Sequence, residues 1–259
     1  MKVYFFTIVL DGMPFITHHL PVFNRLSFDW EWRIVEGVAL PENCTRWCGR
    51  IDPRISMDGT AEYLREIAYH PCVRVCSRTA WAGKIEMVRE ATKDIPGGSL
   101  VVEVDSDELW DDGSLSALYR RMLRAEEGTE ARFFCRYFVG HDLIVNSINT
   151  YGNKPDEWVR AWKWGPESRF ESHEPPVVSP RSAIIHRETT VADSIFDHYA
   201  YATEKQLAFK ETYYRYHGAV EGWKRLQRQT VFPVRLSEFF PWVKDGATVI
   251  RCSNDWLPF

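Results

Sequence analysis

The chain has 259 residues, of which 45% are hydrophobic and 26% charged, and its formal net charge is −4. This length and composition are those of a globular protein that buries a full core, as one large domain or two small ones. The mildly acidic balance argues against a nucleic-acid backbone as the partner. No apolar run is long enough to span a bilayer and the opening "MKVYFFTIVLDG" makes a poor secretion signal, so we expect a cytoplasmic protein.

The first half alternates strand and helix patterns. Its strands are continuous apolar runs bounded by turn residues, and its helices carry apolar residues at helical spacing, with Asp58 or Thr60 as an N-terminal cap and Gly128 as a stop. Such an alternation predicts a mostly parallel sheet with helices on both faces. The predicted strands are 3–10, 30–37, 73–76 and 99–104, and the predicted helical stretches are 13–26, 56–70, 82–95 and 111–128.

The second half is less regular. We expect strands at 131–140 and 181–186, and a helical cover from 203–218 and 219–229. The Gly- and Pro-rich region 145–180 reads as ordered loop, anchored by its aromatic residues. Trp162 and Trp164 lie in it; core anchoring is favoured over stacking on a sugar ring. We find no repeat or linker, and therefore predict a single domain over 1–259.

The six cysteines are interpreted as reduced, mostly buried thiols rather than as a zinc site. Cys44/Cys48 and Cys72/Cys76 have three residues between their members, within the loose range for zinc ligands. However, "CVRVC" alternates like a strand, which places its thiols roughly 13 Å apart at about 3.3 Å per residue. One zinc ion cannot be held by both.

Acidic residues follow three of the predicted strands. Asp11 ends the first, Glu36 ends the second, and Asp105-Ser106-Asp107 ends the fourth. In an open α/β sheet the ligand crevice lies beyond the carboxyl ends of the strands, so neighbouring strands would bring these acids to one edge. The alternative is that each acid only serves a turn.

The Asp105-Ser106-Asp107 segment has the pattern D-x-D, which predicts a metal site. In extended backbone the two carboxylates project to the same side, where their repulsion favours a cation between them. A hard divalent ion with oxygen ligands, Mg²⁺ or Mn²⁺, fits, and it keeps positions open for substrate phosphates. The alternative is a solvated acidic turn that caps the following helix.

This order of strand, acid, helix and D-x-D over residues 3 to about 110 resembles the GT-A-fold nucleotide-sugar glycosyltransferases of the family-2-like group. The resemblance implies a nucleotide-sugar-binding half, 1–110, and an acceptor-binding half with C-terminal helices, 111–259. It also implies a UDP- or GDP-sugar donor and a glycan or other hydroxyl-bearing acceptor. In this sequence Asp11 and Glu36 would contact the nucleoside, and Asp105 and Asp107, with Ser106 between them, would hold Mn²⁺ or Mg²⁺ against the diphosphate.

The resemblance also implies roles for basic residues and histidines. Lys84 is expected to contact the donor. Arg89 lies about 140° from Lys84 around the helix, so it is as compatible with a surface ion pair to Glu86 or Glu90 as with a donor contact. His198 in "FDHYAY" would complete the metal shell, with His186 as its rival.

An inverting transferase further needs a base near the acceptor, and "RFESHEPPVV" offers Glu174, with His173 or Glu171 as alternatives. The predicted activity is hexosyl transfer with inversion; a retaining enzyme would need no such base, and the sequence leaves both open. A metal-dependent nucleotidyltransferase is the main alternative, although the Gly-rich basic loop expected after its first strand is missing from "LDGMPFITHHL". A phosphohydrolase with an aspartyl nucleophile would have the D-x-D pattern after the first strand, where this sequence has only Asp11-Gly12. A non-catalytic carbohydrate-binding protein would use the tryptophans but leaves the strand-end acids unexplained.

Overall fold

The chain folds around a seven-stranded sheet, and the computed structural model describes residues 1–43, 48–186 and 196–252. The strand order is β12-β6-β9-β4-β1-β2-β3. β1 to β4 are parallel, β12 is parallel to β6, and β9 is antiparallel to both of its neighbours. The predicted α/β class is confirmed. The strands are β1 (Val3–Val9), β2 (Trp30–Ala39), β3 (Val73–Trp81), β4 (Leu100–Glu103), β6 (Thr129–Arg132), β9 (Val159–Lys163) and β12 (Ala183–Ile185).

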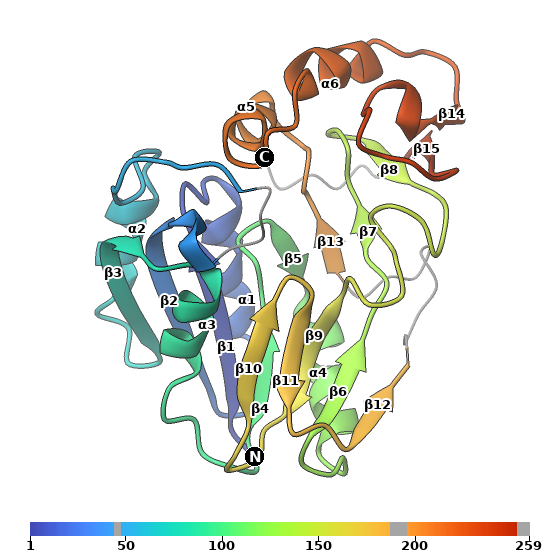
Figure 1. The fold of residues 1–259 in the computed structure, drawn as a ribbon. Helices are drawn as coiled ribbons and strands as arrows, with labels where there is room; N and C mark the ends of the chain where they lie inside the picture. Colours follow the sequence, from blue (N-terminus) through green and yellow to red (C-terminus); the bar gives the residue numbers. More distant parts are fainter. Residues whose placement is uncertain (44–47, 187–195, 253–259) are drawn as a thin grey trace.

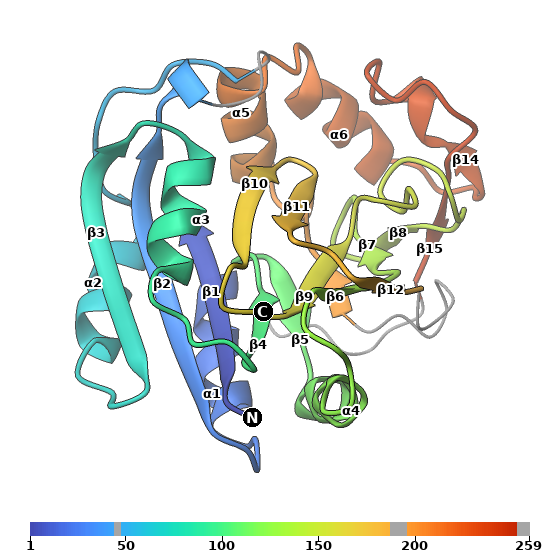
Figure 2. The same cartoon turned by 60° about the horizontal axis from the view of Figure 1, so that its bottom comes forward.

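Alternate residues of the central strands enter different cores, so both faces of the sheet are covered. In β1, Phe5 packs with the cluster on one face and Phe6 with the cluster on the other. α1, α2 and α4 contribute to the first core, and α3 to the second, where it also packs beside β10 (Figure 2). These helices are α1 (His19–Phe23), preceded by the 3₁₀ turn η1 (Phe15–His18), α2 (Thr60–Ile67), α3 (Lys84–Thr92) and α4 (Asp112–Met122).

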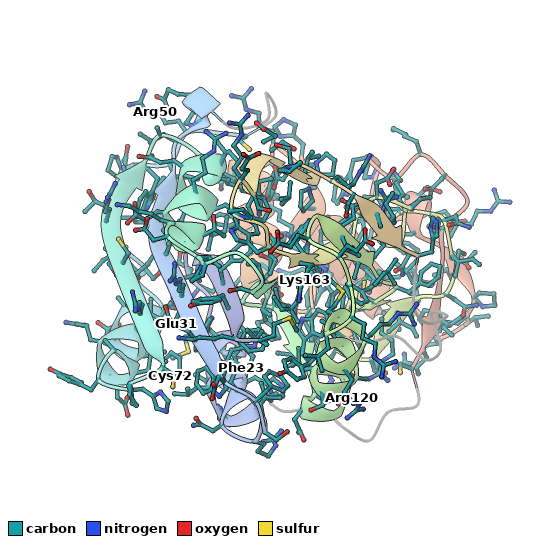
Figure 3. The ribbon with its side chains drawn as sticks, turned by 90° about the horizontal axis from the view of Figure 1, so that it is seen from below. Phe23, Glu31, Arg50, Cys72, Arg120 and Lys163 are labelled. Carbon is teal, nitrogen blue, oxygen red and sulfur yellow. The ribbon has the colours of Figure 1, made fainter. Side chains whose placement is uncertain are left out.

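Aromatic side chains pack between α1 and the strands β1 and β2. Figure 3 looks at the molecule from the side where these strands begin, and Phe23 lies there beside β1 and β2. Its ring stacks on Phe5 at 4.1 Å and meets Trp32 edge-on at 5.4 Å. This aromatic packing holds α1 against one face of the sheet.

β3 is longer than the predicted strand 73–76. It lies at the edge of the sheet, where residues 77–80 are exposed or half-buried, so the sequence has no continuous apolar signal beyond residue 76. Cys72 precedes this strand and Cys76 lies within it, as the alternation predicted. Cys72, Cys76, Cys135 and Cys252 are free thiols, and Cys44 lies outside the described residues.

The region 145–180 is not a loop, and here the sequence-based prediction is wrong. It contains β9, which joins the central sheet between β4 and β6, and a hairpin of β10 (Arg169–His173) and β11 (Pro176–Ser179). Every residue of β9 is buried although two of its five are basic, which hides the strand from a search for apolar runs. The predicted anchoring is confirmed: Trp162 and Trp164 are buried, and both pack against Phe170.

The predicted C-terminal helices are present, and they lie above the ends toward which β1, β2 and β4 run (Figure 1). They are α5 (Glu204–Tyr213) and α6 (Ala219–Gln227). Short strands complete the second half: β5 (Glu108–Trp110), β13 (Phe196–His198) and β7 (Arg136–Tyr137) form one sheet, and β14 (Val234–Arg235), β15 (Thr248–Arg251) and β8 (Leu143–Val145) another. Within the described residues, two further 3₁₀ turns are η2 (Pro41–Asn43) and η4 (Leu236–Glu238). Of the described helices, none has the length and apolar character needed to cross a bilayer.

Candidate active site

A cleft of about 970 Å³ lies at the carboxyl ends of β1, β2 and β4. After β1 the chain builds β2 and β3 on one side, and β4 then returns to the other side of β1. This reversal is the topological switch point at which open α/β sheets bind ligands. Leu10, Gly37 and the segment 105–107 line the cleft from the strand ends, while α3, α5 and the β10–β11 hairpin supply its walls.

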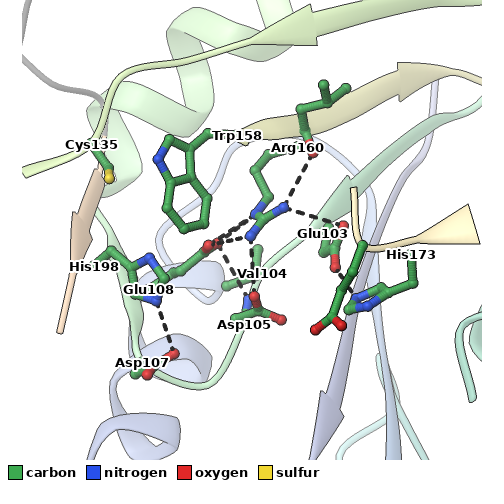
Figure 4. A network of polar contacts seen from close by, with 12 residues as sticks. Glu103, Val104, Asp105, Asp107, Glu108, Cys135, Trp158, Arg160, His173 and His198 are labelled. Atoms are coloured by element: carbon green, nitrogen blue, oxygen red, sulfur yellow. Dashed lines mark hydrogen bonds and ion pairs between the residues drawn. The ribbon is translucent and has the colours of Figure 1, made fainter. Parts of the chain in front are cut away.

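The acidic segment forms a turn rather than extended backbone. The amide of Glu108 donates to the carbonyl of Asp105 (3.0 Å), so Asp105 and Asp107 do not project together as the sequence predicted. Asp105 faces Arg160, with 3.1 Å between Oδ2 and Nη2, whereas Asp107 faces His198, with 3.6 Å between Oδ1 and Nε2 (Figure 4).

Arg160 of β9 is the counter-ion of the acidic cluster. Its guanidinium binds both carboxylate oxygens of Glu108, at 2.8 to 3.1 Å, and approaches Glu103 at 3.6 Å as well as Asp105. Burial raises the pKa of Asp105, and Arg160 opposes that rise while the negative Glu103 adds to it. Repulsion among these carboxylates is therefore relieved within the protein.

Asp107 is held by groups from the C-terminal half. Besides His198, the side-chain amide of Gln206 at the start of α5 donates to its Oδ2 at 3.2 Å. Burial by itself would raise the pKa of Asp107, but His198 and Lys210 more than offset this and lower it below its usual range. Asp107 is thus ionised, and α5 is docked directly on the acidic segment.

Glu103, the last residue of β4, forms a buried pair with His173 of β10. Nε2 of His173 lies 2.8 Å from Oε1 of Glu103. Burial opposes the charge on His173, but Glu103 outweighs it and raises the pKa of the imidazole. Within the described residues, Glu103, Asp105 and His173 are the group whose ligand atoms lie close enough, within 4.8 Å, to share one metal ion. Asp107 and His198 stand beside this group, not in it.

Lys84 and Glu174, expected as donor contact and base, form an ion pair. Lys84 Nζ, at the start of α3, contacts Oε1 of Glu174 in the β10–β11 turn and donates to the Tyr214 hydroxyl at 2.7 Å. Burial disfavours the charge on Lys84, but Tyr214 and Glu174 raise its pKa well above the ordinary value. All three residues line the cleft.

Asp11 and Glu36 hold the segment 54–57 against the strand ends. Asp11 accepts from Arg54 (2.6 and 3.2 Å) and from the amide of Met57 (2.8 Å), and Glu36 accepts from the amide of Ser56 (3.1 Å). Burial would raise the pKa of Asp11, but its bonds to Arg54 and Met57 lower it. Glu36 does not end β2, which extends to residue 39. Its carboxylate can be buried inside the strand because it is bonded to the buried Ser56. Neither side chain is among those lining the cleft.

Arg89, His186 and Glu171 also lie outside the cleft lining. Arg89 donates to the carbonyl of Phe170 (3.0 and 3.1 Å) and so ties α3 to β10, instead of forming the surface ion pair considered for it. His186 follows β12 and is exposed. Glu171 pairs with Arg169 on the exposed face of the hairpin (2.8 Å).

The sequence pattern did not identify Arg160, Glu103, Glu108 and Lys210 as site residues. Glu103 lies in "LVVEV", which was predicted as a strand, and Arg160 lies in "VRAWK", within the region predicted as loop. Glu108 follows the D-x-D segment, and Lys210 is one of several charged residues on α5. A charged residue inside an apolar strand was the available signal, since such a residue needs a buried partner of opposite charge.

No family model and no curated protein sequence matches the chain, whereas solved structures do. S. aureus TarS is 13% identical with a TM-score of 0.50, covering 82% of this chain and 38% of that one. TarS 1-349 in complex with UDP-GlcNAc is 11% identical with a TM-score of 0.47, covering 81% of this chain and 65% of that one. The complex of TarS 1-349 with UDP is 14% identical with a TM-score of 0.43, covering 63% of this chain and 47% of that one. The chain thus spans less than two thirds of the length of each of these chains. At such identity the likeness concerns the fold, which is GT-A-like.

Proposed function

We propose that the cleft transfers a sugar from a nucleoside diphosphate sugar to an acceptor hydroxyl. The observation that carries the proposal is the emergence of Asp105 and Asp107 from β4 at the switch point of the sheet, on the lining of a cleft of about 970 Å³. TarS, a glycosyltransferase solved with UDP and with UDP-GlcNAc, has a similar fold and supports this substrate class.

In this proposal the nucleoside lies on the side of β1 and β2, in residues 1–110. Leu10 and Gly37 line that side, and Ser106 of the acidic turn also lines the cleft. Asp11 and Glu36 act through the segment 54–57 that they hold in place. The acceptor lies on the other side, against residues 111–259, where the lining is rich in tyrosine.

A divalent cation, Mn²⁺ or Mg²⁺, fits the donor set. Asp105 and Asp107 offer carboxylate oxygens, and Oε2 of Glu103 and Nδ1 of both His173 and His198 are buried without a hydrogen-bond partner among the described residues. Oxygen ligands with an imidazole suit these ions. When bound, the ion would stabilise the charge on the departing diphosphate. We propose Asp105 and Asp107 as its ligands, with His198 or the Glu103–His173 pair completing the shell.

Glu174 is the proposed base for the acceptor hydroxyl. Its carboxylate is 29% exposed at the tip of the hairpin and is positioned by Lys84, so it can approach an acceptor from the cleft wall. His173, oriented by Glu103, is the alternative. With Glu174 in this role the anomeric centre of the sugar would invert.

Calorimetry tests the donor site. UDP and GDP are titrated into the protein with Mn²⁺ and with chelator, and we expect one of them to bind only with the metal. Asp107→Ala should abolish this binding, whereas Asp112→Ala is the matched control, because Asp112 is an exposed acid paired with Arg25. Equal affinity in chelator, or in the Asp107 variant, would contradict the metal site. Following a label in the sugar and in the nucleotide separates glycosyl from nucleotidyl transfer.

A further inference from the structure

Three buried or half-buried basic side chains line the cleft, and they differ in how their charge is balanced. Arg160 is surrounded by Glu103, Asp105 and Glu108, and Lys84 is paired with Glu174. For Lys210, among the residues that the structure describes, no carboxylate lies within ion-pair distance of Nζ. Of these three side chains, Lys210 is therefore the one whose charge is still available to an anion.

The position of Lys210 is fixed by the start of α5. Thr203 and Gln206 form a capping box, and Gln206 donates to Asp107 (3.2 Å) and to the carbonyl of Tyr199 (2.7 Å). Residues four apart lie on the same face of a helix, so Lys210 projects one turn beyond Gln206 on the face that is docked at the acidic turn.

Aromatic rings hold the ammonium group of Lys210 in the cleft. Nζ lies over the ring of Tyr201 at 4.9 Å and over that of Tyr214 at 5.5 Å. Burial is the largest influence on its pKa, which falls below the ordinary value although Asp107 opposes this. A cation held by ring faces loses hydration without gaining an anionic partner, so binding of an anion is more favourable there than at a solvated lysine.

We propose that Lys210 binds the diphosphate of the donor from the wall of the cleft that α5 forms. This inference rests on the proposed function and adds a residue to it. The two lysines approach the space next to Asp105 and Asp107 from α3 and from α5. Because Lys84 already has a carboxylate partner, Lys210 is the one that adds net positive charge where the diphosphate would lie.

The consequence for transfer is electrostatic. As the acceptor oxygen bonds to the anomeric carbon, the bond from that carbon to the diphosphate oxygen breaks, and its electron pair stays on the diphosphate. The acceptor proton passes to the base, Glu174. Lys210 stabilises the charge that grows on the leaving oxygen, and it does so without reorganising, since the rings of Tyr201 and Tyr214 already fix its position.

Calorimetry with UDP, UMP and uridine in Mn²⁺ tests this role, with GDP, GMP and guanosine if the protein prefers guanine. Lys210→Met should lower diphosphate affinity roughly tenfold to a hundredfold, the range for a hydrogen bond to a charged group. Monophosphate affinity should fall less, and nucleoside affinity should stay unchanged. Lys205→Met is the matched control: Lys205 lies on the same helix but is exposed and paired with Asp58 (3.4 Å).

The outcomes separate the two proposals. If the wild-type protein binds neither UDP nor GDP, the proposed function is refuted, and so is the proposed role of Lys210. If the wild type binds and Lys210→Met binds equally well, only the role of Lys210 is refuted. Lys210→Gln keeps a polar side chain and controls for a loss of affinity that is caused by misfolding. It should show the same loss of diphosphate affinity with an unchanged circular dichroism spectrum.

Discussion

Replacing Arg160 with Met tests the account of the buried acidic cluster. The substitution keeps the length of the side chain but removes the charge that binds Glu108, Glu103 and Asp105. Asp105 is 27% exposed and can be hydrated, and Glu103 keeps its bond to His173. Glu108 has no comparable compensation, because it is fully buried and Arg160 makes three contacts of 2.8 to 3.1 Å with it.

The cost follows from the contacts that Glu108 loses. Burial already raises the pKa of Glu108 to about 7 in the wild type, against the opposition of Arg160. Most of the cost of protonating this carboxyl at pH 7 is therefore present before Arg160 is removed. Removing one partner of a buried ion pair costs roughly 3–5 kcal/mol, and we expect a loss of this size.

Protonation of Glu108 adds little pH dependence to this loss. A group whose pKa is raised in the folded state stabilises fully below its unfolded pKa, and this contribution is lost as pH rises through the folded value. Because the folded pKa of Glu108 is already about 7, a further rise in the Arg160 variant changes the free energy of unfolding by at most about 0.4 kcal/mol at pH 7 and by less at pH 5.

Thermal unfolding followed by circular dichroism measures this effect. At about 2–4 °C per kcal/mol, Arg160→Met should lower Tm by roughly 6–20 °C at both pH 7 and pH 5. The control is Arg65→Met, since Arg65 forms an exposed i,i+3 pair with Glu62 and should change stability by less than about 1 kcal/mol at either pH. A Tm difference for Arg160→Met that is as small as that of the control, or that is confined to pH 7, would refute the reasoning.

Two further predictions concern the base and a helix cap. Glu174→Gln should keep diphosphate affinity but lower transfer at least about a hundredfold, because an amide cannot accept the proton of the acceptor; undiminished transfer would leave Glu174 a purely structural partner of Lys84. Asp111→Ala should destabilise the protein by about 1 kcal/mol in denaturant unfolding, since Asp111 caps α4 by accepting from the amide of Ser114 (2.7 Å); an unchanged midpoint would show that this cap contributes nothing.

Local pattern was sufficient for the first half of the fold. The strands β1 and β4 are nearly continuous apolar runs because they are buried on both faces, and that burial is visible in the sequence. Pattern failed where burial was achieved by pairing charges. β9 is fully buried but contains Arg160 and Lys163, so it does not look apolar, and the sheet could not be completed from the sequence.

The sequence by itself determined that acids follow the central strands and that Asp105 and Asp107 end β4. Only the tertiary structure decided what those acids do: Asp11 and Glu36 tether a segment, whereas Asp105 and Asp107 line a cleft. Their partners come from distant positions, 55 residues away for Asp105 and Arg160 and 99 for Asp107 and Gln206. Charge pairing acts through space and its energy depends on separation and burial, so a pair this far apart along the chain leaves no periodic signal in the sequence.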